Sequence, residues 1–386
     1  MKIKYRCFLF YNQRWRIGVV RWKVVSESWL ACHSNTPPWG QIGTPMFGKR
    51  LKDSPDILLD RFELDKKIWA VAGGKGGTGK TVLTSNLGVG LAILGYKVIL
   101  IDGDLGGADL HLSFGMPVPK RNLNDFLSGR VSSLSDVLLP TRSANLSIIC
   151  GGSELIGLAN LPYQRKEKIK RHISRLDADF ILVDLGAGTA YNTLDFFIIS
   201  NEGILVCNPE PQAKIDAYAF VKNAVYRRLL LAFGKNTILK ELILNFGNNG
   251  HRALKIRDLV NLIGEHAPEY GDEARKLVET FRPKLIMNKV RKKSQMEDAE
   301  RFTFLVREYL NVEIDYLGHI ENDERVVDAC ENMRPFLLEE PTSKVSLSLY
   351  SILFNMSVHD RQLRYDKKSY KRMYKGVKLE SKLWKE

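Results

Sequence analysis

Cysteine is scarce in this sequence, and its spacing excludes several classes of protein. The 386 residues include five cysteines, none of which forms a C-x-x-C pair with another. That scatter offers no framework for a zinc site, an iron–sulfur cluster or the disulfides of a small secreted protein. Single, widely spaced cysteines instead predict a protein of the reducing cytoplasm.

Long apolar runs are also missing. The most apolar stretch, residues 82–101, includes Lys97 and several polar residues, so it predicts a buried helix followed by a strand and not a membrane span. Basic residues such as Arg14 and Arg16 interrupt the beginning of the chain and exclude the apolar core of a signal peptide.

Acidic residues are outnumbered, 44 against 58 basic ones, giving a formal net charge of +14. The excess is concentrated at the two ends of the chain. Residues 1–45 contain one acidic residue and residues 358–386 contain four, while both segments are rich in Lys and Arg. Basic ends can contact anionic lipid, nucleic acid or an acidic partner, and a merely solubilising tail explains them equally well.

Glycine is concentrated in one stretch, Ala70–Thr81, which reads AVAGGKGGTGKT. Its spacing matches the Walker A pattern, in which backbone amides surround phosphates, a lysine reaches the β- and γ-phosphates, and a hydroxyl holds Mg²⁺. An apolar strand-like run precedes it and an apolar helical run follows, as the motif requires. The predicted nucleotide-binding residues here are Gly74, Lys75, Gly76, Gly77, Thr78, Gly79, Lys80, Thr81 and Val82.

Two further strand-like runs end in carboxylates. In Val98–Leu112 a buried strand ends at Asp102 and Asp104, and we expect Asp102 to be a structural cap or turn residue. In Asp179–Thr189 an apolar run leads to Asp184, which fits a Walker B carboxylate that bridges to Mg²⁺ through water. Gly188 follows and allows the backbone to approach the γ-phosphate closely. Thr81 and Asp184 are therefore the predicted Mg²⁺ site.

The glycine loop contains a lysine in addition to Lys80. This residue, Lys75, makes the motif KGGTGKT resemble the MinD/ParA family of deviant Walker A ATPases. The resemblance implies that Lys75 crosses a dimer interface to the partner's nucleotide, and that Asp104 positions the attacking water. With Lys80 these form the expected catalytic set. It also implies that Asn288, in KLIMNKVR, reads the adenine edge.

The order of predicted elements favours an α/β fold with a doubly wound, mostly parallel sheet of the P-loop NTPase (SIMIBI/MinD-like) type and helices on both faces. Helical patterns include Tyr163–Leu176 and Gln295–Leu310. The predicted strands are Lys67–Ala72, Lys97–Ile101, Leu146–Cys150, Asp179–Asp184, Gly203–Val206, Lys284–Asn288 and Ile314–Leu317.

Four segments follow from this reading. Residues 1–62 are an N-terminal extension that is disordered or non-native; we favour a natural start at Met46 over a segment that docks on a membrane or partner. Residues 63–357 are the ATPase domain, in which 225–283 add a helical segment. Residues 358–386 are a basic tail, either exposed or lying on a membrane surface as an amphipathic helix.

The resemblance implies an ATP- and Mg²⁺-dependent dimerisation switch with slow, partner-stimulated hydrolysis that positions or counts a flagellum, a division site or a DNA cargo. Flagellar-number regulators of the FleN/FlhG type are the most specific case, although the Asp-Gln-Ala motif of some members is absent. The expected location is the cytoplasm, with peripheral contact to the inner face of the cell membrane through the tail; DNA contact is left open.

Two alternatives from other classes remain. A bacterial tyrosine autokinase would use the C-terminal tyrosines Tyr365, Tyr370 and Tyr374, but such kinases lack the lysine found at Lys75. A nucleotide-dependent partner-binding module without hydrolysis is the second. Metal-cluster carriers of the Mrp type share the loop, but they need the paired cysteines that are absent here.

Overall fold

The computed structural model describes residues 6–11, 14–19, 67–104, 107–152, 169, 171–200, 202–248, 255–359 and 367–385. The chain divides into two compact units, Met1–Ser54 and Pro55–Glu386. In the first, β1 (Arg6–Tyr11) and β2 (Arg14–Val19) form an antiparallel hairpin. Most of the predicted extension, most of the helix predicted over Tyr163–Leu176, and Tyr365 lie outside the described residues, and the start at Met46 stays a prediction.

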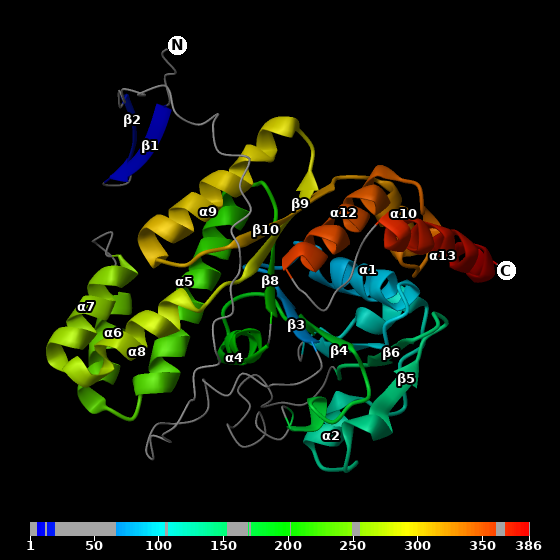
Figure 1. Ribbon diagram of the computed structural model, residues 1–386, viewed down its shortest axis with the longest axis horizontal. Coiled ribbons are helices and arrows are strands. Elements are labelled where there is room, and N and C mark those ends of the chain that lie inside the picture. Colours follow the sequence, from blue (N-terminus) through cyan, green and yellow to red (C-terminus); the bar gives the residue numbers. More distant parts are fainter. Residues whose placement is uncertain are drawn as a thin grey trace, which may run out of the picture. The chain divides into compact units, whose positions relative to one another are not determined.

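The second unit is built on an eight-stranded sheet with the strand order β10-β9-β8-β3-β7-β4-β6-β5 (Figure 1). All neighbouring strands are parallel except β5 and β6. The doubly wound, mostly parallel sheet predicted from the sequence is confirmed. The strands are β3 (Lys67–Ala72), β4 (Val98–Gly103), β5 (Leu138–Pro140), β6 (Leu146–Ile149), β7 (Phe180–Leu185), β8 (Glu202–Cys207), β9 (Lys284–Val290) and β10 (Asp315–Glu321).

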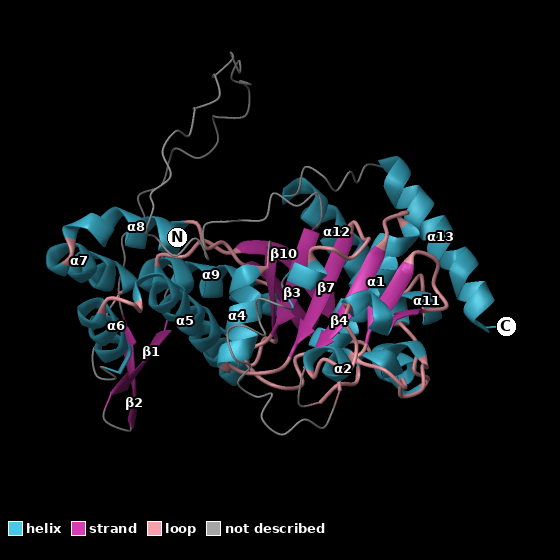
Figure 2. Cartoon of the chain, turned by 90° about the horizontal axis from the view of Figure 1, so that it is seen from below, coloured by secondary structure: helices cyan, strands magenta, loops and turns pink. Residues whose placement is uncertain are grey.

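Two helical layers cover the sheet (Figure 2). Alternation along β3 explains this, because Trp69 and Val71 enter one hydrophobic core while Ile68 and Ala70 enter the other. The first face packs against α1 (Lys80–Ile93), η1 (Leu110–Phe114), α10 (Arg325–Glu331), α11 (Phe336–Glu339), α12 (Lys344–His359) and α13 (Lys367–Lys385). The second packs against α2 (Leu123–Leu127), α4 (Tyr191–Ile199), α5 (Pro211–Phe233) and α9 (Glu297–Leu310).

The described part of residues 225–283 contains the end of α5 and three further helices, α6 (Thr237–Asn248), α7 (Ile256–His266) and α8 (Pro268–Glu279). The helices α7 and α8 pack closely at Gly264 and Gly271, where a Cβ on Gly271 would lie 3.2 Å from the Gly264 Cα atom. Their buried aliphatic residues extend the second core beyond the sheet.

The C-terminal segment differs from the exposed tail that its composition favours. Its helix α13 buries Met373, Val377 and Trp384 in the first core. Gly376, which weakens a helix by propensity, is needed for this packing, since a Cβ there would lie 2.6 Å from Cγ2 of Ile93. Among the described residues, none of the helices combines the length and hydrophobicity needed to cross a bilayer.

Candidate functional site

The predicted site residues meet at the carboxyl edge of the sheet, where the parallel strands end. β3 lies in the middle of the sheet between β8 and β7, and the glycine loop connects it to α1. Asp184 is at the end of β7, and Asp102 is its register partner on β4. Ligand sites of open parallel sheets form in this position, because the loops leave the strands there.

Glycine is required at several points of the loop for different reasons. Gly77 and Gly79 have φ angles of 75° and 89°, which side chains rarely tolerate. Gly74 lies against the backbone of α5, and a Cβ there would be 2.3 Å from the carbonyl carbon of Asp216. A Cβ on Gly76 or Gly77 would meet no heavy atom within 4 Å. The loop is therefore fixed on one side and open on the other.

Thr81 and Asp184 are in direct contact. The Thr81 hydroxyl donates a hydrogen bond to Oδ2 of Asp184 at 2.6 Å, and the Thr84 hydroxyl donates to Oδ1 at 3.2 Å. Burial raises the pKa of the Asp184 carboxyl, and the hydrogen bond from Thr81 and the positive charge of the buried Lys80 partly oppose this rise. The effect of burial is the larger one, and the pKa of Asp184 is raised to about 7.

Asp102 lies beside Asp184 and is fully buried. Its two oxygens accept hydrogen bonds from the backbone N–H groups of Asp104 and Leu110, so it has the structural role predicted from the sequence. Burial, and then the neighbouring Asp184 carboxyl, raise the pKa of Asp102 to about 8. Two adjacent buried carboxyls that resist ionisation form a region that favours a cation.

This raised pKa predicts a pH-dependent stability for the metal- and nucleotide-free protein. Between about pH 4 and 8 folded Asp102 holds a proton that the unfolded chain, with the ordinary pKa of 3.8, releases. The free energy of unfolding should therefore fall as pH rises through this range, by on the order of 5 kcal/mol, since each of the roughly four pH units contributes about 1.4 kcal/mol. In Asp102→Asn this contribution disappears, so the stability of the variant relative to wild type should increase as pH rises. Urea unfolding of both proteins at pH 5 and pH 8 measures the difference.

The control is Asp272→Asn, whose carboxyl side chain is almost fully exposed. Its stability should keep the same pH dependence as wild type. Equal pH dependence in wild type and Asp102→Asn would contradict the prediction.

The structure brings the two aspartate loops together. The Asp104 carboxylate lies beside Gly186, where a Cβ would be 3.1 Å from Oδ1 of Asp104. The backbone N–H of Gly188 donates to the carbonyl of Gly73 at 3.3 Å, which connects the loop after β7 to the start of the glycine loop. Asp104 is half-buried and faces this junction, a suitable place for a carboxylate that orients water.

The remaining predicted residues, Val82, Lys75 and Asn288, lie in different surroundings. Val82 follows Thr81 on the first turn of α1, and Lys75 is half-buried near the end of β8. Burial raises the pKa of the Cys207 thiol there to about 12, and the charges of Lys214 and Lys75 partly oppose this rise. Asn288 is buried, and its Nδ2 donates to the Thr78 carbonyl at 2.7 Å while Oδ1 accepts from the Lys289 backbone. Its adenine contact stays a prediction, because the amide already holds the loop.

Sequence reasoning missed two polar contacts. Thr84 follows Thr81 by three residues, so helical spacing alone could have placed both hydroxyls on one face of α1. Lys289 donates from Nζ to the carbonyl of Gly77 at 2.9 Å. No sequence signal indicates this second contact, since it joins the end of β9 to a glycine-loop residue that is far away in the chain.

The residues present fit a nucleotide with Mg²⁺. Oxygen donors of the kind that Mg²⁺ prefers adjoin each other at Thr81 and Asp184. The open side of Gly76 and Gly77 leaves room for phosphates, and the buried Thr78 hydroxyl has no hydrogen-bond partner within the described residues. Lys80 supplies the positive charge. The set therefore suits a phosphate chain and its cation.

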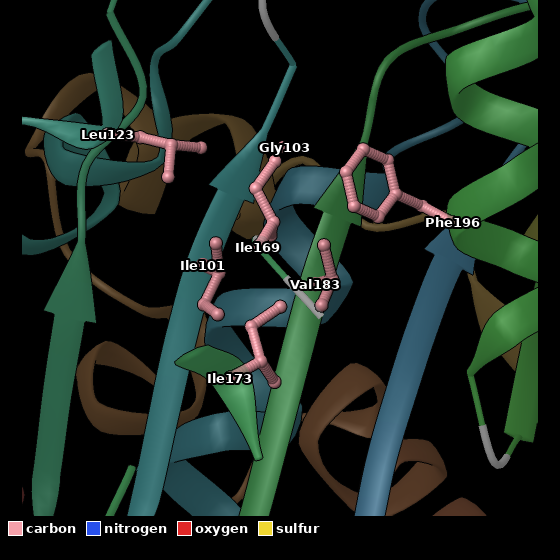
Figure 3. A pocket seen from close by; sticks show the side chains of 7 residues that line it. All are labelled: Ile101, Gly103, Leu123, Ile169, Ile173, Val183 and Phe196. Atoms are coloured by element: carbon pink, nitrogen blue, oxygen red, sulfur yellow. The ribbon is translucent and has the colours of Figure 1, made fainter. Parts of the chain in front are cut away.

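A small pocket on the opposite face of the sheet is apolar and separate from this site (Figure 3). It adjoins the two acidic strand ends, since Gly103 precedes Asp104 and Val183 precedes Asp184. Side chains alternate along a strand, so these residues face away from α1. The pocket contains no group for a phosphate and is lined by Ile101, Gly103, Leu123, Ile169, Ile173, Val183 and Phe196.

The fold and the site define a P-loop nucleotide-binding domain. The sequence profile of the CobQ/CobB/MinD/ParA nucleotide binding domain (CbiA) matches residues 69–336. The chain belongs to this family, which confirms the resemblance seen in the sequence.

Three relatives illustrate the match. The antiactivator FleN of Pseudomonas aeruginosa is 30% identical over 74% of this chain and 84% of its own length. The flagellum site-determining protein YlxH of Helicobacter pylori is 32% identical over 40% of this chain and 53% of its own. A septum site-determining protein MinD of Oltmannsiellopsis viridis is 30% identical over 47% of this chain and 57% of its own length. The chain thus spans most of FleN and just over half of the other two.

Solved structures support the fold. The cell division ATPase MinD of Pyrococcus furiosus aligns with a TM-score of 0.50 at 22% identity, over 76% of this chain and 99% of its own. A chain of the MinC:MinD cell division protein complex of Aquifex aeolicus aligns with a TM-score of 0.50 at 20% identity, over 78% of this chain and 98% of its own length. At this identity the likeness concerns the fold alone.

Proposed function

We propose that this chain binds and hydrolyses ATP and dimerises in its ATP-bound form, and that the dimer positions or counts a cellular structure. The observation that carries the proposal is a series of contacts that connects the glycine loop to the end of β7, and the loop after β7 to Asp104. Asp184 touches Thr81, and Gly188 bonds to Gly73. Gly186 of the same loop lies beside Asp104, which follows β4, so a change at the γ-phosphate would reach the loop after β7 directly and the loop after β4 through it.

Each side chain has a part in the proposed reaction. Lys80 neutralises phosphate charge, and Asp104 orients the attacking water. Thr81 directly, and Asp184 through water, would hold Mg²⁺, which would supply charge neutralisation at the phosphates. Lys75 would reach the nucleotide of the partner subunit, and for that reason hydrolysis and dimer release are linked.

A flagellar role is the specific case that we favour. It is supported by the names of two relatives, the antiactivator FleN and the flagellum site-determining protein YlxH. Further proposed partners are a protein that stimulates hydrolysis and an anionic membrane. For the latter, α13 keeps Leu379 and Leu383 exposed among basic residues while its other side is buried.

The proposal is tested by size-exclusion chromatography with light scattering in ADP and in ATP, each with Mg²⁺. Wild type should be a dimer only in ATP. Asp104→Ala should stay dimeric in ATP for longer, because hydrolysis is blocked, and Lys75→Ala should stay monomeric. A monomer in every state for wild type would contradict the dimerisation switch and favour a plain nucleotide-binding module.

A further inference from the structure

The end of β9 departs from a regular strand beside the glycine loop. Pairing with β10 shifts in register after Met287: the next paired residue is Val290, while β10 advances by only two residues over the same interval. Asn288 and Lys289 therefore oppose a single residue of β10, as in a β-bulge. Lys289 also has a φ of 57°, which is uncommon for a residue other than glycine.

The bulge lets two consecutive side chains reach the same loop. In a regular strand successive side chains point to opposite faces, so one of the two would face away. Here Asn288 Nδ2 donates to the carbonyl of Thr78 at 2.7 Å, and Lys289 Nζ donates to the carbonyl of Gly77 at 2.9 Å. Both donors thus hold adjacent carbonyls of the glycine loop.

Holding these carbonyls also sets the direction of the amides that follow them. In a planar trans peptide the C=O and N–H groups point in opposite directions. With the carbonyls of Gly77 and Thr78 turned toward β9, the N–H groups of Thr78 and Gly79 are turned away from it. A phosphate-binding loop works through amides that converge on the anion.

The contact is close and depends on one glycine. A Cβ on Gly79 would lie 2.3 Å from Nδ2 of Asn288, so only glycine allows the amide to approach the loop. Gly79 has a φ of 89° as well, which makes the same position unsuitable for a side chain on conformational grounds. Loop and bulge are therefore fitted to each other.

We propose that Asn288 and Lys289 form a brace that presets the phosphate-binding amides of the glycine loop. They are positioning residues, because they act through the loop carbonyls and not on the phosphates. That the anion is the phosphate chain of ATP rests on the proposed function. Beyond the proposed function, the brace identifies the residues that order the glycine loop before a nucleotide binds.

Lys289 is the better residue to test. Asn288 is 7% exposed, so removing its side chain leaves a buried void, whereas Lys289 is exposed and its removal leaves no buried group unpaired. We compare Lys289→Met, which keeps the aliphatic stem, with Lys289→Arg, which keeps a charged donor. Lys293→Met is the control: it removes the same charge from an exposed side chain four residues further along.

The binding experiment uses the full chain and three probes, ATP, ADP and inorganic tripolyphosphate, titrated by calorimetry. Lys289→Met should weaken all three by the same factor, about five- to tenfold, as expected for an exposed charge-assisted hydrogen bond. The affinities of Lys289→Arg for the three probes should lie within about twofold of those of wild type. The affinities of Lys293→Met should equal those of wild type.

Three binding results would overturn the brace. Unchanged affinities in Lys289→Met would show that the contact does not order the loop. Weakening of ATP and ADP without weakening of tripolyphosphate would assign Lys289 to the base or the ribose. An equal loss in Lys289→Met and Lys289→Arg would also overturn it, since a donor would then not be what matters.

Hydrogen exchange without nucleotide separates this inference from the proposed function. In the free protein, Lys289→Met should speed amide exchange in a peptide covering residues 76–80, and Lys293→Met should not. Unchanged exchange there would overturn the brace even if ATP binds. Wild type that fails to bind ATP would instead remove the proposed function, and the exchange result would still decide the brace.

Discussion

Lys80→Ala should lower the affinity for ATP by at least about a hundredfold while leaving the chain folded. A charge-assisted hydrogen bond is worth about 1.5–3 kcal/mol, and the lysine of such a loop makes more than one to a phosphate chain. Since each 1.4 kcal/mol is a factor of ten, two such bonds account for the expected loss. Isothermal titration calorimetry with ATP and Mg²⁺ measures it.

The control for Lys80 is Lys235→Ala, a lysine exposed after the end of α5 that should bind ATP like wild type. Circular dichroism must show both variants folded, because the Lys80 charge also acts on the buried Asp184 carboxyl. Wild-type affinity in folded Lys80→Ala would mean that ATP does not lie over this loop.

Gly74→Ala should cost about 2–3 kcal/mol of stability and weaken nucleotide binding as well. The added Cβ would lie 2.3 Å from the carbonyl carbon of Asp216 and 2.6 Å from the backbone nitrogen of Ala217. These are atoms of the α5 backbone, which cannot move aside as a flexible side chain would, so the loop must shift. Overpacking of this kind typically costs 1–3 kcal/mol. Urea unfolding gives the difference in stability.

Gly76→Ala is the matched control for stability, because a Cβ there meets no heavy atom within 4 Å. Its free energy of unfolding should stay within about 0.5 kcal/mol of wild type. It is no control for binding, since its methyl group would lie on the open side of the loop. Equal stabilities of the two variants would contradict the close contact between Gly74 and α5.

Much of the sheet could be predicted because buried parallel strands are short apolar runs. Each of the seven predicted runs overlaps an observed strand, with boundaries that differ by a few residues. β5 was missed because it has only three residues, ends in Pro140 and is not fully buried. The bulge at the end of β9 was missed too, since it depends on pairing with β10 and not on the local sequence.

The C-terminal helix shows the limit of reading amphipathic patterns. Its spacing of apolar residues among lysines predicts a helix with one apolar side, but it does not say what covers that side. The structure buries Met373, Val377 and Trp384 in the protein's own core, so much of the side expected to lie exposed or on a membrane is already covered. Among the α13 residues whose burial is described, the large apolar side chains that stay exposed are Leu379 and Leu383.

The sequence was sufficient to identify the family of this protein and to predict its nucleotide loop, because the glycines, Lys80 and Thr81 lie within one short stretch whose backbone geometry is local. The tertiary structure alone decided which distant groups meet that loop. It set Asp102 beside Asp184, turned Asn288 and Lys289 onto neighbouring carbonyls, and docked α13 on α1. Such contacts join residues far apart in the chain, and only the packing of the whole sheet fixes their positions.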